Sequence, residues 1–188
     1  FVFGQNPGSN HPRMLGELRR AAKRGCRIVV FNPLRERGLE RFTDPQSPAE
    51  MLAGGSTAIA SHYFQPKIGG DLAVATGIAK IVVELADGEP EAQTLEVGAL
   101  DRAFIAANTH GYDDWADLER ESGLTRAQLT RAAQVYLDSH AAIFCWGMGI
   151  TQHRRSVATI QMLMNLLLLR GNIGKPGAGP CPVRGHSN

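Results

Sequence analysis

The chain is organised around the stretch Arg27-Ile28-Val29-Val30-Phe31-Asn32-Pro33, a continuous apolar run that ends in a polar residue and a proline. An apolar run of this length without alternation is typical of a parallel strand that is buried on both faces. Just upstream, Arg13–Arg24 carries leucine and alanine along one side and is followed by Gly25, which predicts an amphipathic helix. Phe1–Gly4 is another short apolar run. Residues 1–33 are therefore predicted to form a β-α-β unit.

The same alternation continues toward the C-terminus. A buried-type strand is predicted over 141–146, followed by a helix over 154–169 that is apolar almost all round and is expected to be buried. Helices are also predicted from Asp71 to about Ala86, with Asp71 as the cap, and from the capping box at Thr125 to about Ser139. Strands that alternate with helices predict an α/β fold with an open, mostly parallel, Rossmann-like sheet and helices on both faces.

We expect residues 1–188 to be a single α/β domain. Its predicted parts are the first β-α-β unit (1–33), an irregular excursion rich in turn formers (34–70), a mainly helical part (71–140), and a strand, buried helix and loop (141–188). A short helix is expected over 103–109, and the Gly- and Pro-rich tail from 173 onward is expected to be loop. The chain opens within a predicted strand and closes within a functional-looking loop, so we expect it to be part of a larger polypeptide.

The composition, with 43% hydrophobic and 20% charged residues and a net charge of +2, is ordinary for a soluble globular protein. No apolar run reaches the roughly 20 residues of a membrane span, so no span is expected. No nucleic-acid partner is expected either. Three cysteines without C-x-x-C spacing argue against a disulfide framework or an iron–sulfur site in this segment and favour a reduced, cytoplasmic protein. Two of them, Cys26 and Cys145, are expected to be core residues. No secretory signal is visible, although one upstream of Phe1 stays open.

The distribution of charge is more informative than its sum. Residues 139–188 contain five arginines and lysines and no Asp or Glu, whereas 84–121 are strongly acidic. One interpretation is chance together with a solvated acidic face. The other is that the C-terminal quarter faces an anion with several phosphates.

Three loops follow predicted strands and should meet at the carboxyl edge of the sheet, where ligands of such folds bind. They span residues 4–12, 32–37 and 147–153. Their glycines would let the backbone approach phosphates, and Asn32 stands where a strand end can present a side chain to a ribose. Each loop taken alone is also compatible with an ordinary turn. Gly147-x-Gly149, in particular, has Gln152 where a dinucleotide fingerprint has its third glycine.

Six histidines are scattered without metal-ligand spacing, so no metal ligand is expected within this segment. Four longer motifs, however, occur in order along the chain: Gly4-Gln5-Asn6-Pro7 with Asn10-His11-Pro12, Trp146–Gln152, Leu169–Gly179, and Pro182–Gly185. Together they resemble the molybdopterin (bis-molybdopterin guanine dinucleotide) oxidoreductase family, most of all formate dehydrogenase-like alpha subunits. The resemblance covers most of the chain and is weakest over 34–68. It implies the central domain of a molybdoenzyme in which two pterin guanine dinucleotides hold one molybdenum or tungsten atom.

The resemblance also implies roles for individual residues. Cofactor contacts would come from the three loops, from the turn before the Asp71 helix, and from the turn that carries the tail back to the pterin. Asn6 and Pro7 would lie at a pyrophosphate or guanosine, Asn32 at a ribose and Asp71 at guanine. Gly147, Met148 and Gln152 would lie near the pterin, and Gly171, Asn172 and Gly174 would form the returning turn. The family often has Asp at the position of Asn32. The metal-ligating Cys or selenocysteine and any iron–sulfur cysteines would lie upstream of Phe1, so this segment alone is expected to be inactive.

Arg184 matches the arginine that lies beside the metal in formate dehydrogenases. Its guanidinium would hold a small carboxylate through a fixed fork of donors, and a phosphate or structural contact is the alternative for this residue. The parent is then expected to oxidise a small substrate such as formate by two electrons, with an electron-transfer subunit as a potential partner. Two other interpretations stay open: a NAD-dependent Rossmann dehydrogenase, disfavoured by the missing glycine fingerprint, and a non-catalytic scaffold relative.

Overall fold

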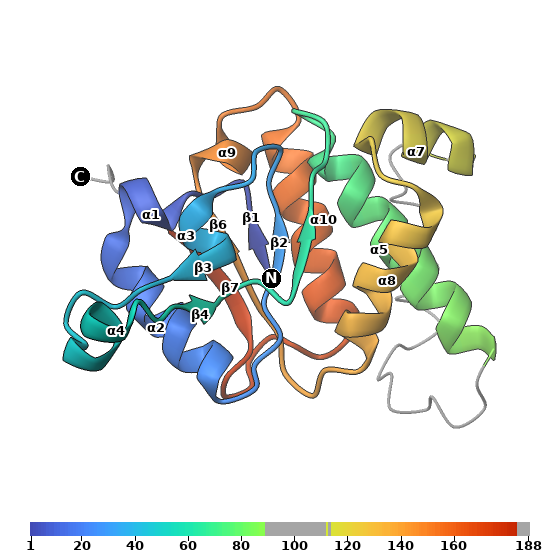
Figure 1. Ribbon diagram of the computed structural model, residues 1–188. Coiled ribbons are helices and arrows are strands. Elements are labelled where there is room, and N and C mark those ends of the chain that lie inside the picture. Colours follow the sequence, from blue (N-terminus) through green and yellow to red (C-terminus); the bar gives the residue numbers. More distant parts are fainter. Residues whose placement is uncertain (89–111, 113, 184–188) are drawn as a thin grey trace.

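The computed structural model describes residues 1–88, 112 and 114–183, and at its centre lies a five-stranded sheet in the order β5-β2-β1-β6-β7 (Figure 1). Every neighbouring pair of these strands is parallel. The strands are short: β1 (Val2–Phe3), β2 (Val29–Phe31), β5 (His62–Phe64), β6 (Ile143–Trp146) and β7 (Gly179–Pro182). The predicted open, mostly parallel sheet is confirmed.

Helices cover both faces of this sheet, as predicted. One face carries α2 (Pro12–Lys23), which packs in one apolar cluster with side chains of β1, β2 and β5. The other face carries α5 (Asp71–Gly88) and α10 (Ser156–Leu169), with α7 (Trp115–Ser122) and α8 (Arg126–Leu137) packed against α5 (Figure 1). Helices lie on both faces because the chain extends the sheet outward from β1 in one direction and then from β6 in the other.

Aromatic side chains hold the strands in register. Phe3, Phe31 and Phe64 occupy equivalent positions on β1, β2 and β5, and their rings stack with centroid distances of 4.9 and 5.2 Å. The helix predicted to be buried is confirmed, since Met162 and four leucines of α10 are almost fully buried. The capping box of α8 is also present, with Thr125 and Gln128 bonded reciprocally.

The predicted excursion 34–70 is only partly irregular. It contains α3 (Arg37–Glu40), β3 (Arg41–Phe42), α4 (Pro48–Ala53) and β4 (Thr57–Ala58), with β3 and β4 antiparallel to each other. It then delivers β5, an edge strand of the main sheet that the sequence pattern did not predict. Arg19 of α2 ties this segment down through ion pairs with Asp44, at 3.2 Å, and with Glu50.

Several finer expectations are corrected. The tail is not loop throughout, because 179–182 forms β7 beside β6. Asp71 is the first residue of α5 and not a cap that precedes it. Cys26 is exposed and not a core residue, since it follows the end of α2. The short helix α7 was not predicted, and the helix expected over 103–109 lies outside the described residues. No helix in the described ranges is long and apolar enough to cross a membrane.

Candidate functional site

The carboxyl ends of β1 and β6 lie side by side at the point where the strand order reverses. Open α/β sheets bind ligands in the crevice beyond such a switch point. From β1 the chain continues through Gly4 to α1 (Pro7–Asn10), and from β6 it continues through Gly147 to α9 (Met148–Thr151). The predicted loops 4–12 and 147–153 are therefore brought together. We call the junction of residues 4–6 with 147–149 the switch-point seam.

The two loops of the seam contact each other at Gly4 and Gly149. A Cβ added to Gly149 would lie 2.3 Å from the carbonyl oxygen of Gly4, a distance that side chains do not tolerate. Gly4 itself has φ of +52°, in the left-handed region that favours glycine. The second glycine of Gly147-x-Gly149 thus serves the close approach of the protein's own loops. This is the ordinary structural role that the sequence left open as an alternative.

A small cavity of about 70 Å³ opens on the seam and is lined by Gln5, His11, Met148 and Val183 among others. Gln5 is 5% exposed, and its amide nitrogen has only the sulfur of Met14 at 3.5 Å as a partner. No described residue offers a hydrogen bond to the buried Gln5 Oε1 or to either ring nitrogen of His11. Buried polar atoms without partners are costly, so they point to a polar ligand or ordered water in this seam cavity.

Gln5 and His11 belong to the first of the four sequence motifs, but sequence reasoning did not select them as site residues. It selected their neighbours, Asn6 and Pro7. Asn6 caps α1 by accepting a hydrogen bond from the Ser9 backbone, and its amide donates to Glu36 Oε2 at 2.6 Å. A phosphate against this amide would also meet the Glu36 carboxylate. The contacts of Asn6 therefore support a role in fixing the loop, and Pro7 is the buried first residue of α1.

Asn32 lies at the carboxyl end of β2, as predicted, and is 8% exposed. Its amide donates to the carbonyl of Leu34 at 3.0 Å, and its backbone N–H donates to Phe64 in the neighbouring strand. The side-chain donor thus holds the local turn. The side-chain oxygen is the atom of Asn32 that could meet a ribose hydroxyl.

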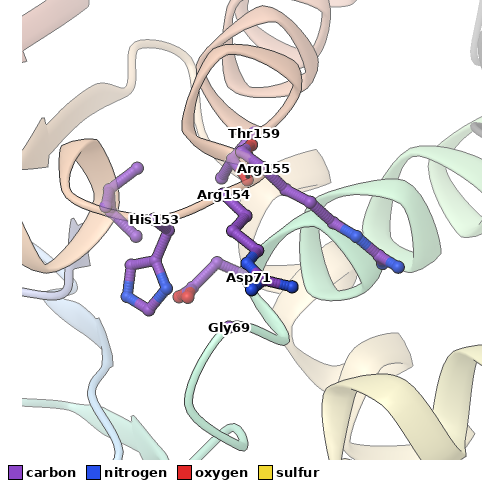
Figure 2. A pocket seen from close by; sticks show the side chains of 7 residues that line it. Gly69, Asp71, His153, Arg154, Arg155 and Thr159 are labelled. Carbon is purple, nitrogen blue, oxygen red and sulfur yellow. Dashed lines mark hydrogen bonds between the residues drawn. The ribbon is translucent and has the colours of Figure 1, made fainter.

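A second cavity, of about 200 Å³, also borders α9 (Figure 2). It is lined by the beginning of α5 with the turn before it, by α9, by the connection between α9 and α10, and by α10: Gly69, Asp71, Ile150, His153, Arg154, Arg155 and Thr159. We call it the Asp71 cavity. In Figure 2 the Asp71 carboxylate points toward the ring of His153. Residues Gly69 and His153 approach closely here, because a Cβ on the glycine would lie 3.8 Å from His153 Nδ1.

Electrostatics in the Asp71 cavity are set by burial. Burial raises the pKa of Asp71 to about 6, and this rise is opposed by its own backbone N–H and by the charge of His153. Arg155 is turned away from Asp71, since its guanidinium donates to Tyr112 Oη at 2.6 Å and lies 3.7 Å from Glu121. The exposed Arg154 reaches the same cavity. A half-buried carboxylate beside a cation suits a ligand with both N–H donors and anionic oxygens.

The remaining predicted residues fall into three places. Gly147 and Met148 line the seam cavity, and the exposed Gln152 has its amide 3.5 Å from the Met148 sulfur. Gly171, Asn172 and Gly174 lie in the turn between α10 and β7, at the opposite, amino edge of the sheet, so the structure does not bring them to the seam. Arg184 lies outside the described residues. Its predecessor Val183 is held at the end of β6 by a 2.8 Å hydrogen bond to Trp146.

Asn172 has a clear structural role at that amino edge. It is 1% exposed, accepts a hydrogen bond from the Ala142 backbone at 3.1 Å, and donates to Tyr136 Oη at 3.0 Å. The tyrosine in turn donates to the Leu166 carbonyl at 2.6 Å. Asn172 thus joins α8, α10 and the start of β6, and these contacts correspond to shaping the turn and not to touching a ligand at the seam.

An open parallel sheet with cavities beside its switch point has the architecture of the dinucleotide-binding type of α/β domain. The family model of the molybdopterin oxidoreductases matches residues 1–187, and the chain belongs to this family. Protein YdeP of Escherichia coli is 48% identical over the whole chain, which covers 26% of that protein. Formate dehydrogenase H of E. coli is 28% identical, again over the whole chain and 23% of the relative.

The solved structure of acetylene hydratase from Pelobacter acetylenicus matches 94% of this chain and 22% of that chain, with a TM-score of 0.69 and 18% identity. At that identity the likeness shows the fold alone. The chain spans about a quarter of the length of the curated relatives that it matches. It is therefore similar to one domain-sized part of each of them.

Membership of the family implies a molybdenum–pterin cofactor, and the residues present fit one. The seam cavity offers buried polar atoms that no described residue satisfies, at Gln5 and His11. The Asp71 cavity offers a carboxylate beside a cationic side chain. Because both openings flank the same short helix, α9, an extended ligand could engage them together.

Proposed function

We propose that this chain is the cofactor-holding part of a molybdenum or tungsten bis(molybdopterin guanine dinucleotide) oxidoreductase that oxidises a small carboxylate such as formate. The observation that carries the proposal is the pair of openings beside α9, one with orphaned polar atoms and one with a half-buried carboxylate. The family match supports the cofactor class, and the match to formate dehydrogenase H supports the substrate class.

The bound cofactor would supply the two-electron redox chemistry, while the protein supplies position and electrostatics. Asp71, ionised for the most part at neutral pH, would accept hydrogen bonds from the N–H groups of guanine. Arg154 would neutralise an adjacent phosphate. Gln5 and His11 would bind polar atoms of the pterin end. Asn6, fixed by Glu36, would keep the loop in place.

Arg184 would hold the substrate carboxylate through paired N–H donors, which fixes the orientation of its C–H bond. The support is the sequence match and the position of Val183, which lines the seam cavity immediately before this arginine. We further propose that the parent is cytoplasmic and passes its electrons to a separate subunit.

The first test is the metal content of the full-length protein purified without air, with the released nucleotide identified by chromatography. About one molybdenum or tungsten atom per chain with guanine nucleotide supports the proposal. A protein without metal, from a host that loads a control enzyme, contradicts it and favours the NAD-dependent or scaffold alternatives.

The substrate is tested separately by formate-dependent reduction of an artificial electron acceptor. Arg184→Lys should retain metal but lose most of the formate activity, because an ammonium cannot reproduce the fork of donors. Arg24→Lys, at an exposed arginine that ends α2, is the matched control and should behave as the wild type. Metal-loaded protein that is inert to formate would exclude formate and leave the cofactor assignment standing.

A further inference from the structure

Strands β6 and β7 bring two of the three cysteines of the chain side by side. In the register of this parallel pair, Cys145 lies directly opposite Cys181. Residues opposite one another on neighbouring parallel strands point to the same face, and the strands lie about 4.8 Å apart. That spacing falls within the Cα separation of about 4.4–6.8 Å that a disulfide spans. Cys26 differs, because it follows α2 and belongs to no strand.

Both thiols of the pair are half-buried and lie on the α2 side of the sheet. On this side α2 leaves part of β6 uncovered, since Ile143 is 45% exposed. A cavity of about 430 Å³ opens there and is lined by Cys145 and Cys26 together with mostly apolar side chains. The cavity gives a small reagent a route to Cys145, while Cys181, which does not line it, keeps partial exposure of its own.

The two thiols also influence each other. Burial raises the pKa of Cys145 to about 12, and the neighbouring Cys181 thiol adds to the rise. A thiol that stays protonated at neutral pH is a poor nucleophile. The first attack on an oxidant would thus come from Cys181, with Cys145 reacting second because it is held beside the newly modified sulfur.

We propose that Cys145 and Cys181 are a modification site, a thiol pair that a small-molecule disulfide such as glutathione disulfide oxidises to an intrachain disulfide. The Cys181 thiolate attacks one sulfur of the oxidant, whose S–S bond breaks and releases one glutathione thiolate. Cys145 then loses its proton to solvent and attacks the Cys181 sulfur, which releases the second glutathione. Two protein thiols are oxidised by two electrons, and one glutathione disulfide is reduced to two glutathiones.

A disulfide between Cys145 and Cys181 would affect the seam cavity because of where the two strands end. β6 ends at Trp146, next to Gly147, and β7 ends at Pro182, next to Val183. Both following residues line the seam cavity. A disulfide would fix the separation of the two strands that deliver these residues, so the oxidation state of the pair is coupled to the geometry of the seam.

The test uses the reduced full-length protein, equilibrated in glutathione buffers of increasing disulfide content, quenched with a thiol-alkylating reagent and digested with trypsin. Mass spectrometry should find the peptides Ala132–Arg154 and Gly171–Arg184 joined by a disulfide. The linked species should grow with the disulfide content of the buffer and disappear on reduction. Cys26→Ser, the matched control, should leave the cross-link intact, whereas Cys145→Ser and Cys181→Ser should each abolish it.

Cys145→Ala and Cys181→Ala repeat the test in case a serine at either position disturbs folding. The peptide map of the wild-type protein tests the proposal without any variant. Alkylated, unlinked peptides from both strands at the most oxidising ratio, with glutathione added only at Cys26, would overturn the proposal. A cross-link from Cys26 to either strand cysteine would overturn it equally, as would a 145–181 bond that forms only after denaturation.

Discussion

At Gly149 a single added methyl group tests how the two loops of the seam meet. The methyl would lie 2.3 Å from the Gly4 carbonyl oxygen, which is backbone and cannot swing away. We expect Gly149→Ala to destabilise the full-length protein by about 1–3 kcal/mol, as overpacking does. Gly16→Ala is the control, because Gly16 lies within α2 with nothing near its Cβ position, and it should stabilise by about 0.5–1 kcal/mol. Urea unfolding measures both, and an unchanged midpoint for Gly149→Ala would contradict the close approach of the two loops.

Asp71 gives a prediction with a defined pH dependence. Its pKa is raised in the folded state, so the folded protein binds a proton more tightly than the unfolded one and loses stability as the pH rises from about 4 to about 6. Asp71→Asn cannot ionise and should make the cofactor-free protein more stable above pH 6, by at most about 3 kcal/mol. The gain should vanish near pH 4. Thermal unfolding across this range measures it, and a gain that persists at pH 4 would mean that charge is not its cause.

Sequence reasoning predicted the positions of the loops better than the contacts that their residues make. Asn6 and Asn32 stand at strand ends, as expected, but their amides are used within the protein, on Glu36 and on Leu34. Gln5 and His11 carry the unsatisfied atoms instead. Which polar atoms remain unpaired depends on the packing of several loops, and no motif or spacing encodes that.

At the scale of elements, the Asn172 network shows how the turn before β7 is held. Removing this side chain leaves the buried Ala142 N–H without an acceptor and removes a donor from Tyr136. We expect Asn172→Ala to cost about 2–3 kcal/mol, because buried polar groups are left unsatisfied. Gln134→Ala removes an exposed hydrogen bond to Asp138 and should cost less than about 0.5 kcal/mol. Equal unfolding midpoints for the two variants would refute the structural role of Asn172.

The start of α8 offers a prediction in which two threonines respond with opposite sign. Thr125 caps the helix by accepting a hydrogen bond from the Gln128 backbone, so Thr125→Ala should destabilise by about 1 kcal/mol. Thr130 lies exposed within the same helix, where alanine has the higher helix propensity. Thr130→Ala should therefore be neutral or slightly stabilising. The two unfolding free energies, measured side by side, decide whether the cap matters.

Strand β7 shows why some elements escaped prediction. Its sequence, Gly179-Pro180-Cys181-Pro182, has the composition of a loop, since proline cannot donate to a sheet. The prolines alternate, however, and the N–H groups of Gly179 and Val183 are the ones that bond to β6. Only the pairing partner makes this arrangement a strand. The long helices α2, α5, α8 and α10 and the strands β1, β2 and β6, by contrast, have strong apolar patterns and were predicted within a few residues.

For the whole molecule, the orphaned atoms of the seam cavity predict a conflict between stability and cofactor loading. Gln5→Leu and His11→Phe remove buried polar groups that no described residue satisfies. The cofactor-free protein should be as stable as the wild type or more so. Metal content after expression should fall, because the ligand loses these contacts. Gln134→Leu, at an exposed site on α8, should leave metal content unchanged. Full loading of both seam variants would remove Gln5 and His11 from the site.

The overall architecture was largely predictable, but its strand order was not. Alternating strands and helices predict a parallel sheet covered on both faces, and the structure has one. That β1 lies at the centre, with the chain growing away from it on both sides, follows from the connections between strands and not from any local pattern. The site could be placed at the carboxyl edge for the same general reason, while its division into two cavities around α9 could not.

The alternating prolines of β7 have a consequence for how the sheet meets its surroundings. Because Pro180 and Pro182 occupy the positions whose backbone nitrogens would face outward, that margin presents carbonyl oxygens without the donors that another strand would require. A strand of a second molecule that approached this border would therefore find no N–H donor at these two positions. Exposed strand margins are the usual starting point of aggregation, and proline is one of the means by which proteins block it. The residues that look least like a strand thus protect the newly folded sheet from self-association along this border.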